Sequence, residues 1–315
     1  MSKTLSSVLL GASLLFLPAA APEASEPIRI GLLPGSAIAW ELDVIRHNGL
    51  DAKYGISIEA VPQDNVDAAR RSLATSAVDI ISGDWFWVSR QRAADTYYVH
   101  VPFLTAAGAA MAAPGVEPGR LADIGAIDSE LGDGTLARQW LLIRALRNSD
   151  TGSSNPEELA LSRNGNVKLV DWQAAARLEV DGYRRIVATD DAASFLGAEG
   201  RMPEIGYVFH EEWPRRNRQE AIGFVRASRE AKRILKDSDA EWDRIRPLMD
   251  AGDDRVFELL KTRFREGIPT RTISDELADA EDIHIVLGPL AARAGADLRA
   301  AISPGTFWRG HPDNP

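Results

Sequence analysis

Aromatic, acidic and basic side chains are concentrated at residues 83–92, which read Gly-Asp-Trp-Phe-Trp-Val-Ser-Arg-Gln-Arg. The stretch follows the apolar run 78–81, which is typical of a short buried strand. Indole rings stack on flat ligands or on cations, and guanidinium groups bind carboxylates and sulfonates. Open α/β sheets collect ligand contacts in the crevice beyond the carboxyl ends of their strands. We therefore expect a loop here that contributes Asp84 and Trp85 to a cleft between two lobes.

The elements that position these residues alternate between strands and helices. Strands are expected at 28–33, 56–61, 78–81, 97–103, 124–127, 167–170 and 184–188. Helices are expected between them at 37–48, 64–76, 136–147 and 172–179. Beyond about residue 205 the pattern changes to helices, at 212–236, 253–265 and 275–294. This rhythm predicts an α/β fold with parallel strands and a helical C-terminal part.

The small-residue run 106–113 lies between the two series of strands and helices. Small side chains let a connection cross closely between two lobes, so a crossover is expected here. An extended core strand is the competing interpretation.

The composition is that of a globular protein with an acidic balance. The chain has 315 residues, 45% of them hydrophobic and 26% charged, and a formal net charge of −10. Nonspecific binding to nucleic acid or to anionic membranes needs a basic face, so this charge argues against both. The absence of cysteine excludes disulfides, thiolate metal sites and a lipid anchor on cysteine.

Residues 1–25 have the features of a secretory signal peptide. Lys3 precedes an apolar segment, Val8–Leu17, and small residues follow it. The apolar segment is shorter than the roughly 20 residues that span a bilayer. We expect cleavage between Ala20 and Glu26 and a location in a bacterial periplasm.

Four short patterns occur in order between residues 28 and 250. They are Gly-Leu-Asp-Ala-Lys-Tyr-Gly-Ile-Ser-Ile-Glu at 49–59, Val-Asp-Ile at 78–80, Asp-Trp at 171–172 with Ala-Arg-Leu-Glu at 176–179, and Gly-Tyr-Val-Phe at 206–209 leading into 224–231. Together they resemble the NitT/TauT (nitrate, sulfonate and taurine) family of ABC-importer substrate-binding proteins. The resemblance implies a type II periplasmic-binding-protein fold, which has two α/β lobes and a hinged cleft. It also implies a monomer that works with an inner-membrane permease and ATPase.

For this chain, the resemblance gives the first part of lobe 1 at 26–104, lobe 2 at 105–204, and the second part of lobe 1 with C-terminal helices at 205–315. In such a cleft the ligand is held by loops that follow strands of both lobes. Thr135 begins an expected helix, whose N-terminus favours an anion, and Arg138 one turn later would add a charge-assisted clamp. The candidate ligand contacts are Ser36, Trp40, Asp84, Trp85, Thr105, Gly134, Thr135, Arg138, Trp140, Asp171, Trp172 and Arg177.

Several aromatic and charged residues have a second interpretation. Trp140 also suits core packing, and Asp171 could instead cap the helix that follows it. Arg90 and Arg92 either line the cleft or lie on a solvated helix face. The tryptophans expected to pack in the core or against the C-terminal helices are Trp87, Trp213, Trp242 and Trp308.

The sequence carries no P-loop, no Gly-x-Ser-x-Gly elbow and no His-Glu-x-x-His helix. Its five histidines are scattered without ligand spacing. We therefore expect no enzymatic activity, no metal site and no cofactor.

These features predict a periplasmic solute-binding component of an ABC importer, with a small anionic, planar or aromatic ligand. The stretch 84–92 also resembles a branch associated with quinoprotein alcohol oxidation, and a tricarboxylated quinone such as pyrroloquinoline quinone would suit its lining. The alternative is an accessory protein of a periplasmic quinoprotein dehydrogenase that uses the same fold without transport. An apolar closed cleft would favour that alternative, and an open polar cleft would favour solute capture.

Overall fold

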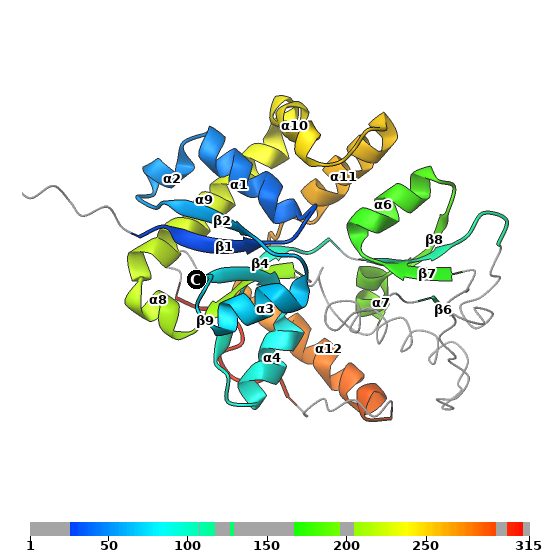
Figure 1. The fold of residues 1–315 in the computed structure, drawn as a ribbon. Coiled ribbons are helices and arrows are strands. Elements are labelled where there is room, and N and C mark those ends of the chain that lie inside the picture. The colour runs from blue at the N-terminus through cyan, green and yellow to red at the C-terminus, as the bar shows by residue number, and fades with distance from the viewer. Residues whose placement is uncertain are drawn as a thin grey trace, which may run out of the picture.

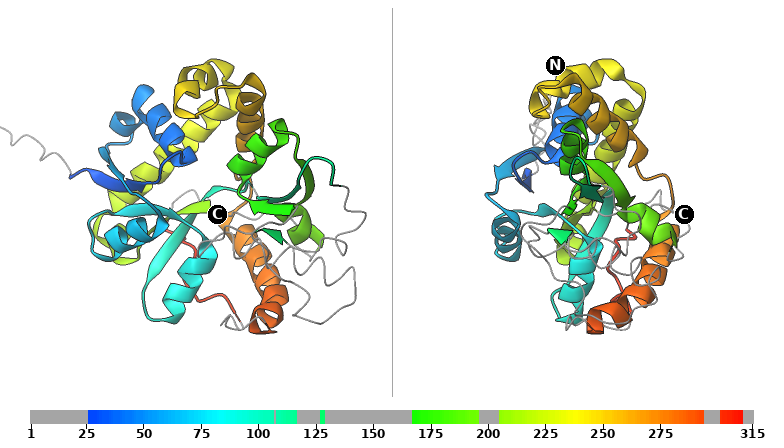
Figure 2. Two further views of the ribbon diagram at one scale, coloured as in Figure 1. Left: turned by 45° about the vertical axis from the view of Figure 1, so that its right-hand side comes forward. Right: turned by 90° about the vertical axis from the view of Figure 1, so that its right-hand side faces the viewer.

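The computed structural model describes residues 26–106, 108–116, 127–128, 167–195, 205–293 and 301–310. Figures 1 and 2 show two β-sheets in separate parts of the molecule, with helices around them. The strands are β1 (Ile28–Leu32), β2 (Ile58–Pro62), β3 (Ile80–Gly83), β4 (Tyr98–Leu104), β5 (Ala109–Ala112), β6 (Ile127–Asp128), β7 (Val167–Val170), β8 (Arg184–Ala188) and β9 (Ile205–His210).

The helices are α1 (Ala37–His47), α2 (Leu50–Lys53), α3 (Val66–Ala74), α4 (Trp85–Ala93), α6 (Trp172–Val180), α7 (Thr189–Phe195), α8 (Glu212–Arg216), α9 (Arg218–Asp237), α10 (Asp239–Ile245), the 3-10 helix η3 (Arg246–Leu248), α11 (Asp254–Glu266) and α12 (Ile273–Arg293). The helices α1, α3, α6, α11 and α12 begin and end within a few residues of the predicted positions, whereas the predicted strand 124–127 (apart from Ile127) and helix 136–147 lie outside the described residues. The single helix expected at 212–236 is divided at Asn217 into α8 and α9.

The large sheet has the strand order β2-β1-β3-β9-β4. β1 is parallel to β2 and to β3, as predicted, whereas β9 lies antiparallel between β3 and β4. The expectation of helices alone beyond residue 205 was therefore wrong. The run Ile-Gly-Tyr-Val-Phe-His at 205–210 is β-prone, and it fills the position that joins β3 to β4.

Alternate residues of β9 face the two layers of helices that cover the large sheet. Tyr207 and Phe209 belong to the larger apolar cluster, together with residues of α1 and α9. Val208 belongs to a separate cluster with residues of α3 and with Trp87 of α4. In Figure 1, α1 and α9 accordingly lie on one side of this sheet, and α3 and α4 lie on the other. Burial of Trp87 confirms its predicted place in the core.

A buried ion pair lies within the larger cluster. The Lys232 ammonium is 2.5 Å from the Glu41 carboxylate, and the two side chains are 6% and 0% exposed. Tyr207 donates a hydrogen bond of 2.5 Å to Glu41, and Lys232 donates one of 2.6 Å to Ser228. Burial lowers the pKa of Lys232, although Glu41 opposes that shift, and burial raises the pKa of Tyr207.

The small sheet has the order β6-β7-β5-β8, with β5 antiparallel to both β7 and β8. The chain leaves the large sheet at Leu104 and enters the small one at Ala109, inside the small-residue run. Beside this connection, Thr105 donates two hydrogen bonds to the Gly267 carbonyl. The bond from the Thr105 amide is 2.7 Å long, and the bond from the Thr105 hydroxyl is 3.0 Å long. A side chain at Gly267 would approach Ala106 to within 2.8 Å of its amide nitrogen, so glycine permits this close packing.

The loop expected at 83–92 is in fact helix α4. Asp84 is its N-cap, and its carboxylate accepts a hydrogen bond of 2.8 Å from the Trp87 amide. The Trp87 amide lies in the first turn of the helix and would otherwise lack an acceptor. This cap favours a helix that begins at Trp85.

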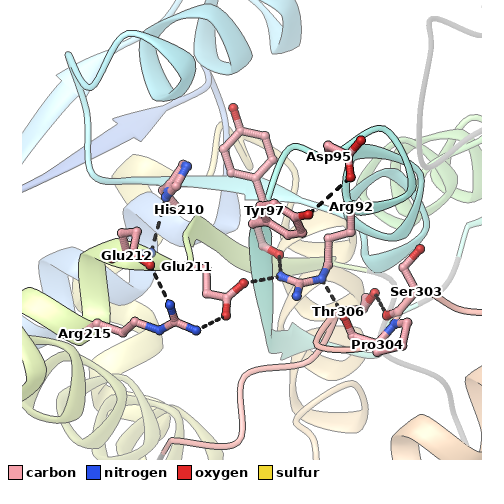
Figure 3. A network of polar contacts seen from close by, with 11 residues as sticks. Arg92, Asp95, Tyr97, His210, Glu211, Glu212, Arg215, Ser303, Pro304 and Thr306 are labelled. Carbon is pink, nitrogen blue, oxygen red and sulfur yellow. Dashed lines mark hydrogen bonds and ion pairs between the residues drawn. The ribbon is translucent and has the colours of Figure 1, made fainter.

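Residues 301–310 lie along the edge strand β4. The His100 amide donates to the Thr306 carbonyl at 2.7 Å, and the Trp308 amide donates to the His100 carbonyl at 2.9 Å. Arg92 holds this segment, because its guanidinium donates to the Pro304 carbonyl at 2.7 Å and pairs with Glu211 at 2.9 Å (Figure 3). Its side chain is 9% exposed, so Arg92 lies neither on a solvated face nor free to bind a ligand.

Candidate functional site

The two sheets meet where the first turns of α1 and α6 face each other. α1 follows β1 of the large sheet, and α6 follows β7 of the small sheet. Gln173 in α6 donates a hydrogen bond of 3.1 Å to the Gly35 carbonyl, just before α1. Two predicted contacts cap these helices: Ser36 accepts from the Ile38 amide at 3.3 Å, and Asp171 accepts from the Ala174 amide at 2.8 Å. The capping interpretation of Asp171 is thereby confirmed.

Two predicted tryptophans contact each other at the same place. Trp40 of α1 and Trp172 of α6 are 0% and 2% exposed, and their ring centroids are 6.0 Å apart in an edge-to-face arrangement. The Trp40 indole donates a hydrogen bond of 3.2 Å to the Leu248 carbonyl. Arg177, one turn beyond Trp172, donates to the Met249 carbonyl at 3.1 Å. The structure therefore brings Trp40, Trp172 and Arg177 together around residues 248–249.

An ion-pair network extends this contact between α6 and α11, which lie side by side (Figure 1). Glu179 of α6 lies 2.5 Å from the Arg263 guanidinium of α11 and 3.1 Å from Arg185 of β8. Burial lowers the pKa of Arg263, while the hydrogen bond to Glu179 acts in the opposite direction. The guanidinium remains charged at neutral pH, so Glu179 links a cation of the small sheet, Arg185 in β8, with a cation of helix α11, Arg263.

Asp84 and Trp85 belong to a different part of the interface between the sheets. Asp84 is 1% exposed and caps α4, and Trp85 is 0% exposed. Trp85 packs in one apolar cluster with residues of the small sheet, of α12 and of the C-terminal segment, including Ala110, Leu169, Ile283 and Phe307. Apolar contacts thus join the two sheets here as well.

Thr105 is buried, and its hydroxyl is already used by the Gly267 carbonyl. Gly134, Thr135, Arg138 and Trp140 lie outside the described residues. Ligand contact by all twelve candidates stays a prediction.

Sequence reasoning missed Gln173 and the pair Glu179–Arg263. Gln173 follows the predicted contact Trp172 in the first turn of α6, and this neighbouring position is the feature of the sequence that could have indicated it. Glu179 and Arg263 are 84 residues apart, and no local pattern links them. Their contact follows only from the packing of α6 on α11.

Within the described residues, no group of three or more histidine, cysteine, aspartate or glutamate side chains is arranged to hold a metal ion. None of the helices in that part of the chain is long and apolar enough to cross a membrane.

Solved structures share this architecture at low sequence identity. The periplasmic aliphatic sulphonate-binding protein SsuA from Escherichia coli matches with a TM-score of 0.66 and 12% identity, over 90% of this chain and 92% of that one. SsuA from Xanthomonas axonopodis pv. citri, bound to MOPS, matches with a TM-score of 0.65 and 13% identity, over 90% and 99% of the two chains. The periplasmic nitrate-binding protein NrtA from Synechocystis PCC 6803 matches with a TM-score of 0.53 and 12% identity, over 76% and 69%.

No family model matches the sequence, and no curated protein sequence matches it. The structural likenesses establish a periplasmic-binding-protein fold with two α/β parts. They confirm the predicted fold and, at the level of the fold, the resemblance to the NitT/TauT family.

Proposed function

We propose that this chain is the periplasmic solute-binding component of an ABC importer, with a permease and an ATPase as membrane partners. The observation that carries the proposal is a fold shared over about 90% of the chain with sulfonate-binding proteins. We assign residues 1–25 to a signal peptide, 26–104 and 205–315 to lobe 1, and 105–204 to lobe 2. The passage from the large to the small sheet between Leu104 and Ala109 supports these boundaries.

The proposed ligand is a small anionic, planar or aromatic solute: a sulfonate, an aromatic carboxylate or a quinone cofactor such as pyrroloquinoline quinone. Thr135 and Arg138 would bind its charge from lobe 2. Ligand binding would draw the lobes together about the crossover, as a population shift between open and closed states. The contact of Gln173 with Gly35 supports a closed state in which α6 meets α1.

Thermal-shift screening against sulfonates, aromatic carboxylates and pyrroloquinoline quinone tests this proposal. A ligand that raises the melting temperature should bind Arg138→Ala more weakly by about 1.5–3 kcal/mol, because a charge-assisted hydrogen bond is lost. Measurement of the affinity by calorimetry decides the role of Arg138, and unchanged affinity would remove it from the site.

A second candidate function is an accessory protein of a quinoprotein dehydrogenase, without transport. The apolar packing between the sheets favours it, both in the pair Trp40–Trp172 and in the cluster that contains Trp85 and Ala110. Co-purification with such a dehydrogenase, together with no melting shift from any solute, would support this function and contradict solute capture.

A further inference from the structure

A cavity of about 450 Å³ lies between β4, α9 and the first turn of α12. An adjoining cavity of about 280 Å³ shares its lining from 268 to 271, together with Lys236 and Glu276. Volumes in this range are typical of sites for small organic ligands. Apart from Thr105, which lines the smaller cavity, neither cavity includes a residue of the candidate site described above.

The walls of the larger cavity divide into a cationic part and an apolar part. Basic side chains of α9 and of the segment before α12 form the cationic part, namely Arg229, Lys232, Arg233, Lys236 and Arg271. Lys232 is neutralised by Glu41, Arg233 pairs with Glu230, and Arg271 pairs with Asp279 at 2.8 Å. The apolar part comprises Val101, Pro102, Val225, Ile268, Ile273 and Trp308. Such a lining suits a ligand with one charged end and a hydrocarbon body.

Glu276 is the acidic residue that lines both cavities. It is 2% exposed, although both cavities include it in their walls. A carboxyl group at such a position is costly to keep charged unless a cation or a hydrogen-bond donor lies beside it.

The charge state of Glu276 fits an anion acceptor. Burial raises the pKa of Glu276 to about 8; Asp279 and Asp275 act in the same direction, and Arg271 and Arg229 oppose the shift. At neutral pH the carboxyl group is therefore mainly protonated, and it can donate a hydrogen bond. A protonated Glu276 adds no negative charge to the wall of the larger cavity, which Lys236 also lines.

We propose that the two adjoining cavities bind a small organic carboxylate. Glu276 donates a hydrogen bond to the ligand carboxylate, and Lys236 supplies the opposite charge. Arg271, which stays paired with Asp279, borders the same end of the site, and the hydrocarbon body lies against the apolar wall beside Trp308. Lys236 and Arg271 lie at the same end of the larger cavity as Glu276, because all three residues also line the smaller cavity. This site does not depend on the function proposed above.

The test is binding of 4-fluorobenzoate to the mature protein, followed by the width of the ligand's fluorine NMR signal, with 4-fluorobenzyl alcohol as the neutral comparison. Lys236→Glu should weaken binding of the carboxylate about tenfold or more, since it reverses a charge beside the ligand. Arg216→Glu is the matched control: Arg216 is also exposed, carries the same change of charge sign, and lies outside both cavities. Its affinity should equal that of the wild type.

Glu276→Gln gives an independent readout, because its amide donates a hydrogen bond at every pH. Affinity of the wild type should fall as the pH rises through about 8, and affinity of Glu276→Gln should not. Equal affinities for Lys236→Glu and wild type would overturn the proposal, as would the absence of binding at millimolar 4-fluorobenzoate. Binding that Arg138→Ala abolishes and Lys236→Glu leaves intact would place the probe between the lobes, and would also overturn it.

Discussion

Trp40 and Trp172 meet edge to face with an angle of 83° between their ring planes, although they lie on helices that follow strands of different sheets. Both rings belong to the larger apolar cluster of the molecule, together with Ala176 of α6 and Leu260 of α11. An edge-to-face aromatic pair contributes about 0.5–1.5 kcal/mol beyond the burial of its area. The small sheet is therefore joined to the large one through a shared core.

Trp172→Ala should reduce the free energy of unfolding by about 3–5 kcal/mol, because it removes a large buried ring and leaves a cavity between α1 and α6. Urea denaturation measures this change. Trp172→Phe should lose less, since it retains an aromatic ring opposite Trp40. Trp213→Ala is the control, because Trp213 is a partly buried tryptophan at the margin of the same cluster. It should reduce the free energy of unfolding by less than Trp172→Ala. An equal cost for the two alanine variants would contradict the shared core.

Asp171 can be tested for ligand contact separately from its role as a cap. Asp171→Ala should destabilise the protein by about 1 kcal/mol, because α6 loses its N-cap. Asp171→Ser retains a capping oxygen but removes the carboxylate, so its stability should stay close to that of the wild type. Once a solute is known from thermal-shift screening, its affinity for Asp171→Ser decides whether the carboxylate also contacts the ligand.

The buried pair Glu41–Lys232 predicts a strong dependence of one substitution on the other. Lys232→Met should cost about 3–5 kcal/mol, because the Glu41 carboxylate keeps its burial and loses its cation. Adding Glu41→Gln should restore part of the loss, since the double variant no longer buries an uncompensated charge. Denaturation of both single variants and the double variant measures the coupling. Additive losses would show that the two groups do not depend on each other.

Glu276 predicts how stability changes with pH. Its folded-state pKa of about 8 lies above the ordinary carboxyl value of 4.5, so the native state keeps a proton that the unfolded chain releases. Its stabilising contribution is therefore complete below about pH 4.5 and is lost as the pH rises through about 8. The stability of Glu276→Gln relative to the wild type should increase from pH 5 to pH 9 in urea denaturation at each pH. A constant difference would contradict the raised pKa.

Much of the fold could be predicted from alternation and spacing, because β1, β2 and α6 are positioned by local hydrophobic patterns. α4 could not, since Trp85, Phe86 and Trp87 bury rings on several sides of one helix and give no helical periodicity. β9 begins at Ile205, 96 residues after β5 begins at Ala109, and its pairing partners β3 and β4 both precede β5 in the chain. A local pattern cannot specify pairing over such separations.

The candidate site shows the same division. Asp84 and Asp171 each precede a tryptophan after a strand, and the structure uses both aspartates as helix caps and both tryptophans as buried packing. The residue types correctly indicated the ends of strands, because helix caps and ligand contacts both occur where a strand ends and a helix begins. They were not informative about partners such as Met249 or Arg263, which come from helices far along the chain.

The position of β9 between β3 and β4 also has a consequence for biosynthesis. The central pairing of the large sheet needs residues 205–210, which are synthesised after the whole of the small sheet. Until then β3 and β4 each lack a neighbour and present unpaired backbone groups that can associate with other chains. Most of this sheet's contacts are distant in sequence, and such topologies fold slowly. A nascent or truncated chain that ends before residue 205 should therefore stay aggregation-prone, and should depend on chaperones until β9 is available.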